Sequence, residues 1–169
     1  MTVQRTRRSR RSGMTLLDVT IAATVLAIAI TALMGLIFSS VRLGRVNREN
    51  VLAMQAARRA IEEMNTVDFA NVFTTYRDNP DFAVTGLAAQ VGDPDGMAGQ
   101  FQFPTVGTAL REDVADAGLG MPRDLDGDGL VDAANHADNY RILPVRVRIS
   151  WRGVSGDRTI DLTTVLMDW

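Results

Sequence analysis

The chain has 169 residues with 18 basic and 20 acidic side chains, and its formal net charge is −2. This balance argues against a nucleic-acid-binding protein, because phosphate recognition needs a concentrated positive surface. Cysteine is absent, which excludes disulfides, and the length allows one globular domain of ordinary size beside an N-terminal segment.

The N-terminus combines a basic leader with a long apolar run. Residues 1–13 hold five arginines and no acid, and Val19 to Val41 is a stretch of 23 residues without a charged side chain. As a helix rising about 1.5 Å per residue, this stretch would cover about 34 Å, close to the hydrocarbon thickness of a bilayer. The arginines favour a cytoplasmic N-terminus, with the rest of the chain on the far side of the membrane. The sequence therefore predicts one membrane-spanning helix.

A cleaved secretory signal peptide fits this segment less well. Such a peptide has an apolar core of about 7 to 15 residues that ends in small residues at its cleavage site. Here the apolar run is longer, and it continues into Arg42, Arg45 and Arg48 without such a site.

One acid, Asp18, stands at the start of the apolar helix. A carboxylate in that place is costly in lipid and usually has a partner or a function. Two simpler interpretations stay open: Asp18 lies at the membrane interface and reaches water, or it is an N-terminal helix charge that the helix dipole favours.

Leader and helix meet in the motif Gly13-Met14-Thr15-Leu16-Leu17-Asp18-Val19. With its surroundings, from about Arg7 to Val41, this motif resembles the processing site of type IV prepilins and type II secretion pseudopilins. In that family a prepilin peptidase cuts after the glycine, and the new N-terminal residue is methylated. The fifth residue after the cut is normally glutamate. This chain departs twice, with Met14 in place of the usual phenylalanine and Asp18 in place of glutamate.

The resemblance implies cleavage after Gly13, methylation of Met14 and a role for Asp18 in assembly. The Asp18 carboxylate would neutralise the terminal amine of a neighbouring subunit and so favour one register. Cleavage would remove the five leader arginines and change the formal net charge from −2 to −7. The implied product is a structural subunit, a minor pilin or pseudopilin, of a type IV pilus, a type II secretion filament or a DNA-uptake machine.

The implied partners are other pilin or pseudopilin subunits, prepilin peptidase, an inner-membrane assembly platform and the membrane itself. The implied location is the bacterial inner membrane, with the head periplasmic or, in a filament, extracellular. A different class stays open: an unprocessed bitopic membrane protein whose extracytoplasmic domain binds a ligand or a partner.

The helical pattern continues beyond the apolar run. An apolar stripe with spacings near three and four follows, consisting of Leu43, Val46, Met54, Ala57, Ile61 and Met64. We therefore expect one helix from about Thr15 to Val67, with residues 14–41 in lipid or a filament core. Residues 42–67 would be an amphipathic extension whose stripe packs on a sheet.

Residues 68–169 are expected to form an α+β head, which gives the chain a pilin-like layout of a long helix on a small antiparallel sheet. Phe69 to Tyr76 continues an apolar pattern as a short helical segment, and proline, glycine and aspartate then mark loops with short strands up to Arg123. Residues 143–167 are predicted to form a β-hairpin, because apolar side chains alternate with polar ones on both sides of the turn at residues 153–157. The arginines that alternate with the apolar residues of its first strand are expected on a solvated face, or opposite acids of a packed subunit.

An acidic loop supplies the sharpest local motif. Its carboxylates are those of Asp124, Asp126, Asp128 and Asp132, and a glycine follows the third. The loop resembles the first half of an EF-hand-type or dockerin-type calcium site, in which alternating oxygens converge on one cation. The twelfth position holds Asn135 in place of a bidentate acid, so Asp132, Asn135 or Asp138 would complete the ligand shell. The other interpretation is an acidic surface turn without a metal.

No catalytic constellation emerges from the sequence, and we expect no enzyme activity. There is no cysteine nucleophile, and no glycine-rich phosphate loop follows a strand. His136 is the one histidine of the chain. Its acidic neighbours predict a surface residue, with metal ligation as the second interpretation.

Overall fold

The structure is a computed structural model that describes residues 15–78 and 80–168. The leader at residues 1–13 and the cleavage site at Gly13 and Met14 lie outside the described residues. The chain divides into two compact units, residues 1–43 and 44–169.

The first unit contains the apolar part of helix α1 (Leu16–Met64). Every described residue of this unit is exposed, and an 18-residue window of α1 reaches a mean hydropathy of 2.5. The hydroxyls of Thr20, Thr24 and Thr31 each donate a hydrogen bond of 2.8 Å to a carbonyl one turn earlier in the helix. The threonines therefore leave no hydroxyl proton unsatisfied in the apolar segment. Among the described residues, α1 is the one helix long and apolar enough to cross a membrane.

The long helix predicted from Thr15 to Val67 is confirmed, but it ends three residues earlier than expected. At Thr66 and Val67 the backbone hydrogen bonds span three residues instead of four. They run from Thr66 N to Glu63 O at 3.0 Å and from Val67 N to Met64 O at 3.1 Å. Such bonds between residues three apart are typical of a helix that closes its last turn and stops.

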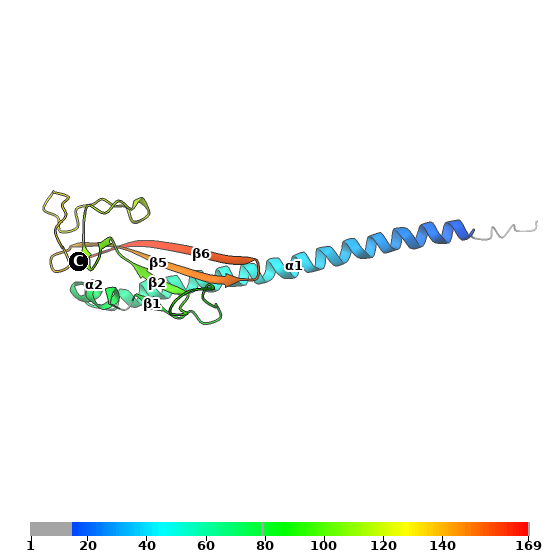
Figure 1. Cartoon of the computed structure of the whole chain (residues 1–169), viewed down its shortest axis with the longest axis horizontal. Coiled ribbons are helices and arrows are strands. Elements are labelled where there is room, and N and C mark those ends of the chain that lie inside the picture. Colours follow the sequence, from blue (N-terminus) through cyan, green and yellow to red (C-terminus); the bar gives the residue numbers. More distant parts are fainter. Residues whose placement is uncertain (1–14, 79, 169) are drawn as a thin grey trace, which may run out of the picture. The chain divides into compact units, whose positions relative to one another are not determined.

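The second unit is built on a four-stranded antiparallel sheet with the strand order β1-β2-β5-β6. Its strands are β1 (Asp81–Phe82), β2 (Gly99–Gln102), β5 (Ile142–Gly153) and β6 (Gly156–Met167). The two long strands β5 and β6 are the orange and red pair in Figure 1, and they form the predicted hairpin, with Val147 opposite Leu162. A separate two-stranded sheet pairs β3 (Thr105–Val106) with β4 (Ala109–Leu110).

The core lies between one face of this sheet and the second half of α1. The helix contributes four buried residues, Ala53, Ala57, Ala60 and Met64. Strand β5 contributes the buried side chains of Leu143, Val145, Val147, Ile149 and Trp151. These residues belong to one apolar cluster, so the predicted packing of helix on sheet and the α+β fold class are confirmed.

The buried stripe of α1 differs in part from the predicted one. Leu43 is exposed, and Met54 and Ile61 are only half-buried. The centre of the contact is made of alanines, because small side chains let a helix backbone come close to the sheet while larger residues fill the flanks. Large apolar residues dominate the periodic signal of a helix, so the predicted stripe lies slightly off the buried one.

Helix α2 (Phe69–Arg77) closes one end of the core with Val72 and Phe73, as predicted for this segment. The Tyr140 hydroxyl donates to Phe69 O at 2.5 Å and accepts from Phe73 N at 3.3 Å. Tyr140 thereby ties α2 to the loops that precede β5. A short 3₁₀ turn, η1 (Ala117–Leu119), lies in those loops.

The arginines of β5 are not simply a solvated face, and that expectation is wrong for Arg146. Its side chain is 13% exposed, and its Nη2 lies 2.6 Å from Asp116 Oδ1. Arg148 pairs with Asp161 of β6 at 2.8 Å. The acids that these arginines meet belong to the same chain.

Candidate functional site

The Asp18 carboxylate caps the start of α1. The Asp18 Oδ2 atom accepts from Thr15 N at 3.2 Å and from Thr15 Oγ1 at 2.8 Å, and Asp18 N donates to Thr15 Oγ1 at 3.3 Å. This reciprocal pattern is a capping box, with threonine at the cap and an acid three residues later. The geometry agrees with the interpretation of Asp18 as an N-terminal helix charge, and its role in assembly remains a prediction.

The acidic loop brings together three of the four predicted metal ligands. Asp124, Asp126 and Asp128 each offer one oxygen, and these oxygens lie within 4.8 Å of one another. The loop backbone turns around them, because Gly127 N and Gly129 N both donate to the Asp124 carboxylate. Gly127 and Gly129 have φ angles of 82° and 88°, a left-handed conformation that favours glycine.

The other three predicted participants lie outside that group. The Asp132 Oδ1 atom accepts from Ala134 N at 2.7 Å and lies 3.1 Å from His136 Nε2. The Asn135 Oδ1 atom accepts from Leu110 N at 3.0 Å, so this amide holds strand β4. Asp138 is exposed.

Glu112 is a buried acid beside the acidic loop that the sequence did not single out. Its side chain is 1% exposed, and its carboxylate accepts backbone hydrogen bonds from Leu125 N at 2.5 Å, Asp126 N at 3.3 Å and Asp132 N at 3.2 Å. This one carboxylate therefore fixes both ends of the acidic loop. Only the fold places it there, since Glu112 stands in a charged stretch that looks like an exposed turn.

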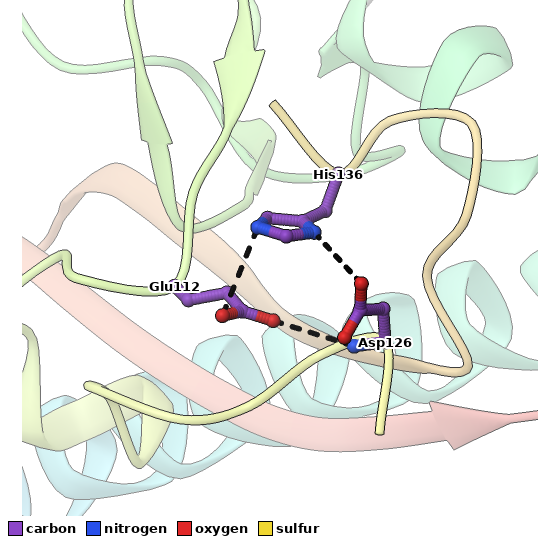
Figure 2. Close-up of side chains that lie close together, drawn as sticks. All are labelled: Glu112, Asp126 and His136. Atoms are coloured by element: carbon purple, nitrogen blue, oxygen red, sulfur yellow. Dashed lines mark hydrogen bonds and ion pairs between the residues drawn. The ribbon is translucent and has the colours of Figure 1, made fainter. Parts of the chain in front are cut away.

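His136 is buried, and the expectation of a surface residue is wrong. It is 5% exposed and lies between the carboxylates of Glu112 and Asp126, with one ring nitrogen toward each (Figure 2). The Nδ1 atom is 3.4 Å from Asp126 Oδ2, and the Nε2 atom is 3.7 Å from Glu112 Oε2. One ligand atom from each of these three residues lies within 4.8 Å of the others.

The charges around His136 favour its protonated form. Burial lowers the pKa of His136, but the hydrogen bond to Asp132 and the negative charges of Glu112, Asp126 and Asp132 outweigh burial. The net pKa is therefore raised above its ordinary value. Despite its acidic surroundings, Nδ1 is a buried atom that makes no hydrogen bond among the described residues.

Comparisons with protein-family models, with curated proteins and with solved structures find no match to this chain. The resemblance to prepilins therefore depends on the leader, the motif around Gly13 and the apolar helix.

Proposed function

We propose that this chain is a type IV pilin-like structural subunit, a minor pilin or pseudopilin, that is processed by a prepilin peptidase and assembled through α1. The observation that carries the proposal is the first part of α1, which is apolar and exposed at every described position and whose first turn is capped by Asp18. Such a surface needs lipid or other helices around it. The basic leader and Gly13 directly before it favour a segment that is first membrane-bound and then bundled with other subunits.

The contacts of Asp18 support its proposed role in assembly. Thr15 engages only the Oδ2 atom, and within the described residues the Oδ1 atom makes no hydrogen bond. That oxygen is available to accept from the amine that cleavage would create on Met14 of a neighbouring subunit. A charge pair of this kind, shielded from water by packed helices, would favour one register of neighbouring subunits.

Processing is tested by the intact mass of the full chain recovered from membranes that contain a prepilin peptidase. We expect the native chain to lose residues 1–13 and to carry one added methyl group. The variant Gly13→Ala should keep the leader, and Thr2→Ala, a matched alanine substitution far from the cut, should be processed normally. Normal maturation of Gly13→Ala, or a native chain that retains its leader, would contradict the proposal.

Assembly is tested separately by incorporation of the processed chain into sheared filaments. Asp18→Glu should assemble, because it keeps the charge, whereas Asp18→Asn should be cleaved but should assemble poorly. Equal incorporation of Asp18→Asn would remove the proposed role of the charge. A native chain that stays uncut and dispersed in the membrane would favour the alternative, a bitopic protein whose head binds a ligand or partner.

We further propose that the acidic loop binds calcium and stabilises the head without disulfides. The convergence of Asp124, Asp126 and Asp128 supports this proposal, because calcium prefers several oxygens from one flexible loop. Without a cation, three carboxylates at this distance repel one another.

A further inference from the structure

A second cluster of metal-ligating side chains lies beside the acidic loop and is centred on His136. It joins residues from three segments: Glu112 after β4, Asp126 within the acidic loop, and His136 before β5. Glu112 and His136 are both more than nine-tenths buried. This cluster therefore differs from an exposed acidic turn, because its nitrogen donor is enclosed by the fold.

The hydrogen bond at one ring nitrogen determines the state of the other. The Nε2 atom lies 3.1 Å from Asp132 Oδ1, a carboxylate oxygen that accepts, so Nε2 carries the proton of this hydrogen bond. In the neutral imidazole, Nδ1 then presents a lone pair. That lone pair lies 3.4 Å from Asp126 Oδ2, a second electron-rich atom, and Nδ1 has no hydrogen-bond partner among the described residues. Two facing lone pairs in a buried place are unfavourable, so either a proton or a metal ion lies between them.

We propose that Asp126 and His136 bind a divalent transition metal of the zinc type, with Asp126 Oδ2 and His136 Nδ1 as ligands, and that Glu112, which faces the Nε2 side of the ring, is a positioning residue. Asp132 is also a positioning residue, because its hydrogen bond to Nε2 holds the ring with Nδ1 toward the metal. Metal-binding histidines commonly donate their second ring N–H to a carboxylate in this way. Figure 2 shows the three side chains converging from their separate segments.

The distance between Nδ1 and Asp126 Oδ2 fits two ligands of one metal ion. Zinc binds histidine nitrogen and carboxylate oxygen at about 2.0–2.2 Å in tetrahedral geometry, which places two ligand atoms about 3.4 Å apart. The distance from Nδ1 to Asp126 Oδ2 is 3.4 Å, and it is not accompanied by hydrogen-bond geometry. Two protein ligands leave two positions of a tetrahedral site for water.

The chemistry of the donors separates this site from the proposed calcium loop. Calcium is bound by oxygen atoms, whereas imidazole nitrogen favours zinc and similar transition metals. The two oxygens of Asp126 also face different groups. The Oδ1 atom accepts from Asp128 N at 3.1 Å inside the loop, and the Oδ2 atom accepts from Asn139 Nδ2 at 2.8 Å on the side of His136.

The alternative to a metal ion between Nδ1 and Asp126 Oδ2 is a proton, which would make His136 an imidazolium between carboxylates. Nitrogen NMR of the full chain in detergent micelles separates the two, because His136 is the one histidine and its signals need no assignment. After treatment with a chelator, the chain is titrated with zinc chloride. We expect one zinc per chain, a large shift of the Nδ1 resonance and an Nε2 that stays protonated. An imidazole spectrum unchanged by zinc would overturn the proposal, as would metallation of Nε2.

Zinc affinity of full-chain variants gives an independent test by calorimetry. His136→Gln should weaken zinc binding at least a hundredfold, and Asp132→Asn should weaken it about ten- to a hundredfold, as expected for a residue that orients a ligand. Asp128→Asn, a matched change in the calcium loop, should leave zinc binding unchanged. Zinc binding that survives in His136→Gln, or zinc that calcium displaces, would assign the metal to the loop and overturn the proposal. Neither experiment depends on cleavage or filament assembly, so the site and the proposed function can fail separately.

Discussion

The indole Nε1 of Trp151 donates to Glu49 Oε2 at 3.4 Å, and this contact joins α1 to the end of β5. The other carboxylate oxygen of Glu49 accepts from Val154 N at 3.2 Å, at the turn between β5 and β6. Trp151 is 1% exposed, so its N–H must find its partner inside the protein. The two residues are 102 positions apart in the chain, and Glu49 is a polar connection between the helix and the hairpin turn.

Loss of this acceptor should destabilise the second unit. Glu49→Ala leaves the buried indole N–H without a partner, and we expect a loss of about 1–3 kcal/mol in the free energy of unfolding. Glu49→Gln keeps an acceptor oxygen and should lose less. Urea unfolding followed by circular dichroism measures the stability of both variants. Equal stabilities of the alanine variant and the native chain would show that the contact contributes nothing.

The fragment Gly44–Trp169 should fold without the first part of α1. Its core residues all fall between Ala53 and Leu166, so the apolar contacts of the second unit are retained in the fragment. We expect a soluble fragment that unfolds cooperatively on heating, measured by circular dichroism. A fragment that aggregates or melts without a transition would mean that the head needs the preceding residues.

Overpacking at the helix–sheet contact should be costly. Ala57 is fully buried against the sheet, so Ala57→Leu forces the helix away and should lower the free energy of unfolding by about 1–3 kcal/mol. The neighbouring change Arg58→Leu also introduces leucine but at an exposed position, and it should cost less than about 0.5 kcal/mol. Similar effects of the two variants in urea unfolding would place the contact on another face of α1.

The pair of Arg146 and Asp116 should make part of the stability depend on pH. The hydrogen bonds from Arg146 lower the pKa of Asp116 below its ordinary value. A carboxyl group with a lowered pKa in the folded state stabilises above its unfolded pKa of about 3.9, and this stability is lost as the pH falls through the lower folded pKa.

The variant Arg146→Met keeps most of the side-chain length and removes the charge. We expect it to be less stable than the native chain at pH 7 by about 1 kcal/mol, because Asp116 is partly exposed and solvent screens the pair. The difference should shrink below about pH 4, in unfolding curves measured from pH 7 to pH 2. A difference that stays constant over this range would mean that packing of the Arg146 stem, and not its charge, stabilises the sheet.

Calcium should raise the thermal stability of the head after a chelator has removed bound metal. At free calcium a hundred times the dissociation constant, one site contributes about 2.7 kcal/mol. Asp128→Asn should abolish the rise in melting temperature, whereas Asp138→Asn, an exposed acid outside the group of three, should retain it. A melting temperature that does not respond to calcium would leave the loop as an acidic turn.

The elements with a clear apolar period could be predicted from the sequence. Helix α1 and the β5–β6 hairpin were expected almost at their observed bounds, because burial on one face imposes a repeat near 3.6 or 2 on the side chains. The buried stripe of α1 was harder to place, because alanine carries little hydrophobic signal although it decides how closely the helix approaches.

The candidate site could be predicted only in its local part. The loop acids Asp124, Asp126 and Asp128 stand at every second position, so their spacing alone predicts that they converge. Glu112 and His136 come from separate segments, and their burial results from how the loops between β4 and β5 pack. A single polar residue in a loop belongs to no periodic pattern from which its burial could be predicted. The charged neighbours of Glu112 and His136 in sequence instead predict exposed positions.

Glu112 also has a consequence for how the acidic loop opens. The amide protons of Leu125, Asp126 and Asp132 share this one carboxylate as their acceptor, although they stand at opposite ends of the loop. If the Glu112 side chain moves away, all three amide protons lose their acceptor at the same time and become open to exchange with solvent. Hydrogen exchange at these amides should therefore slow and quicken together, as a small cooperative opening unit within the native head.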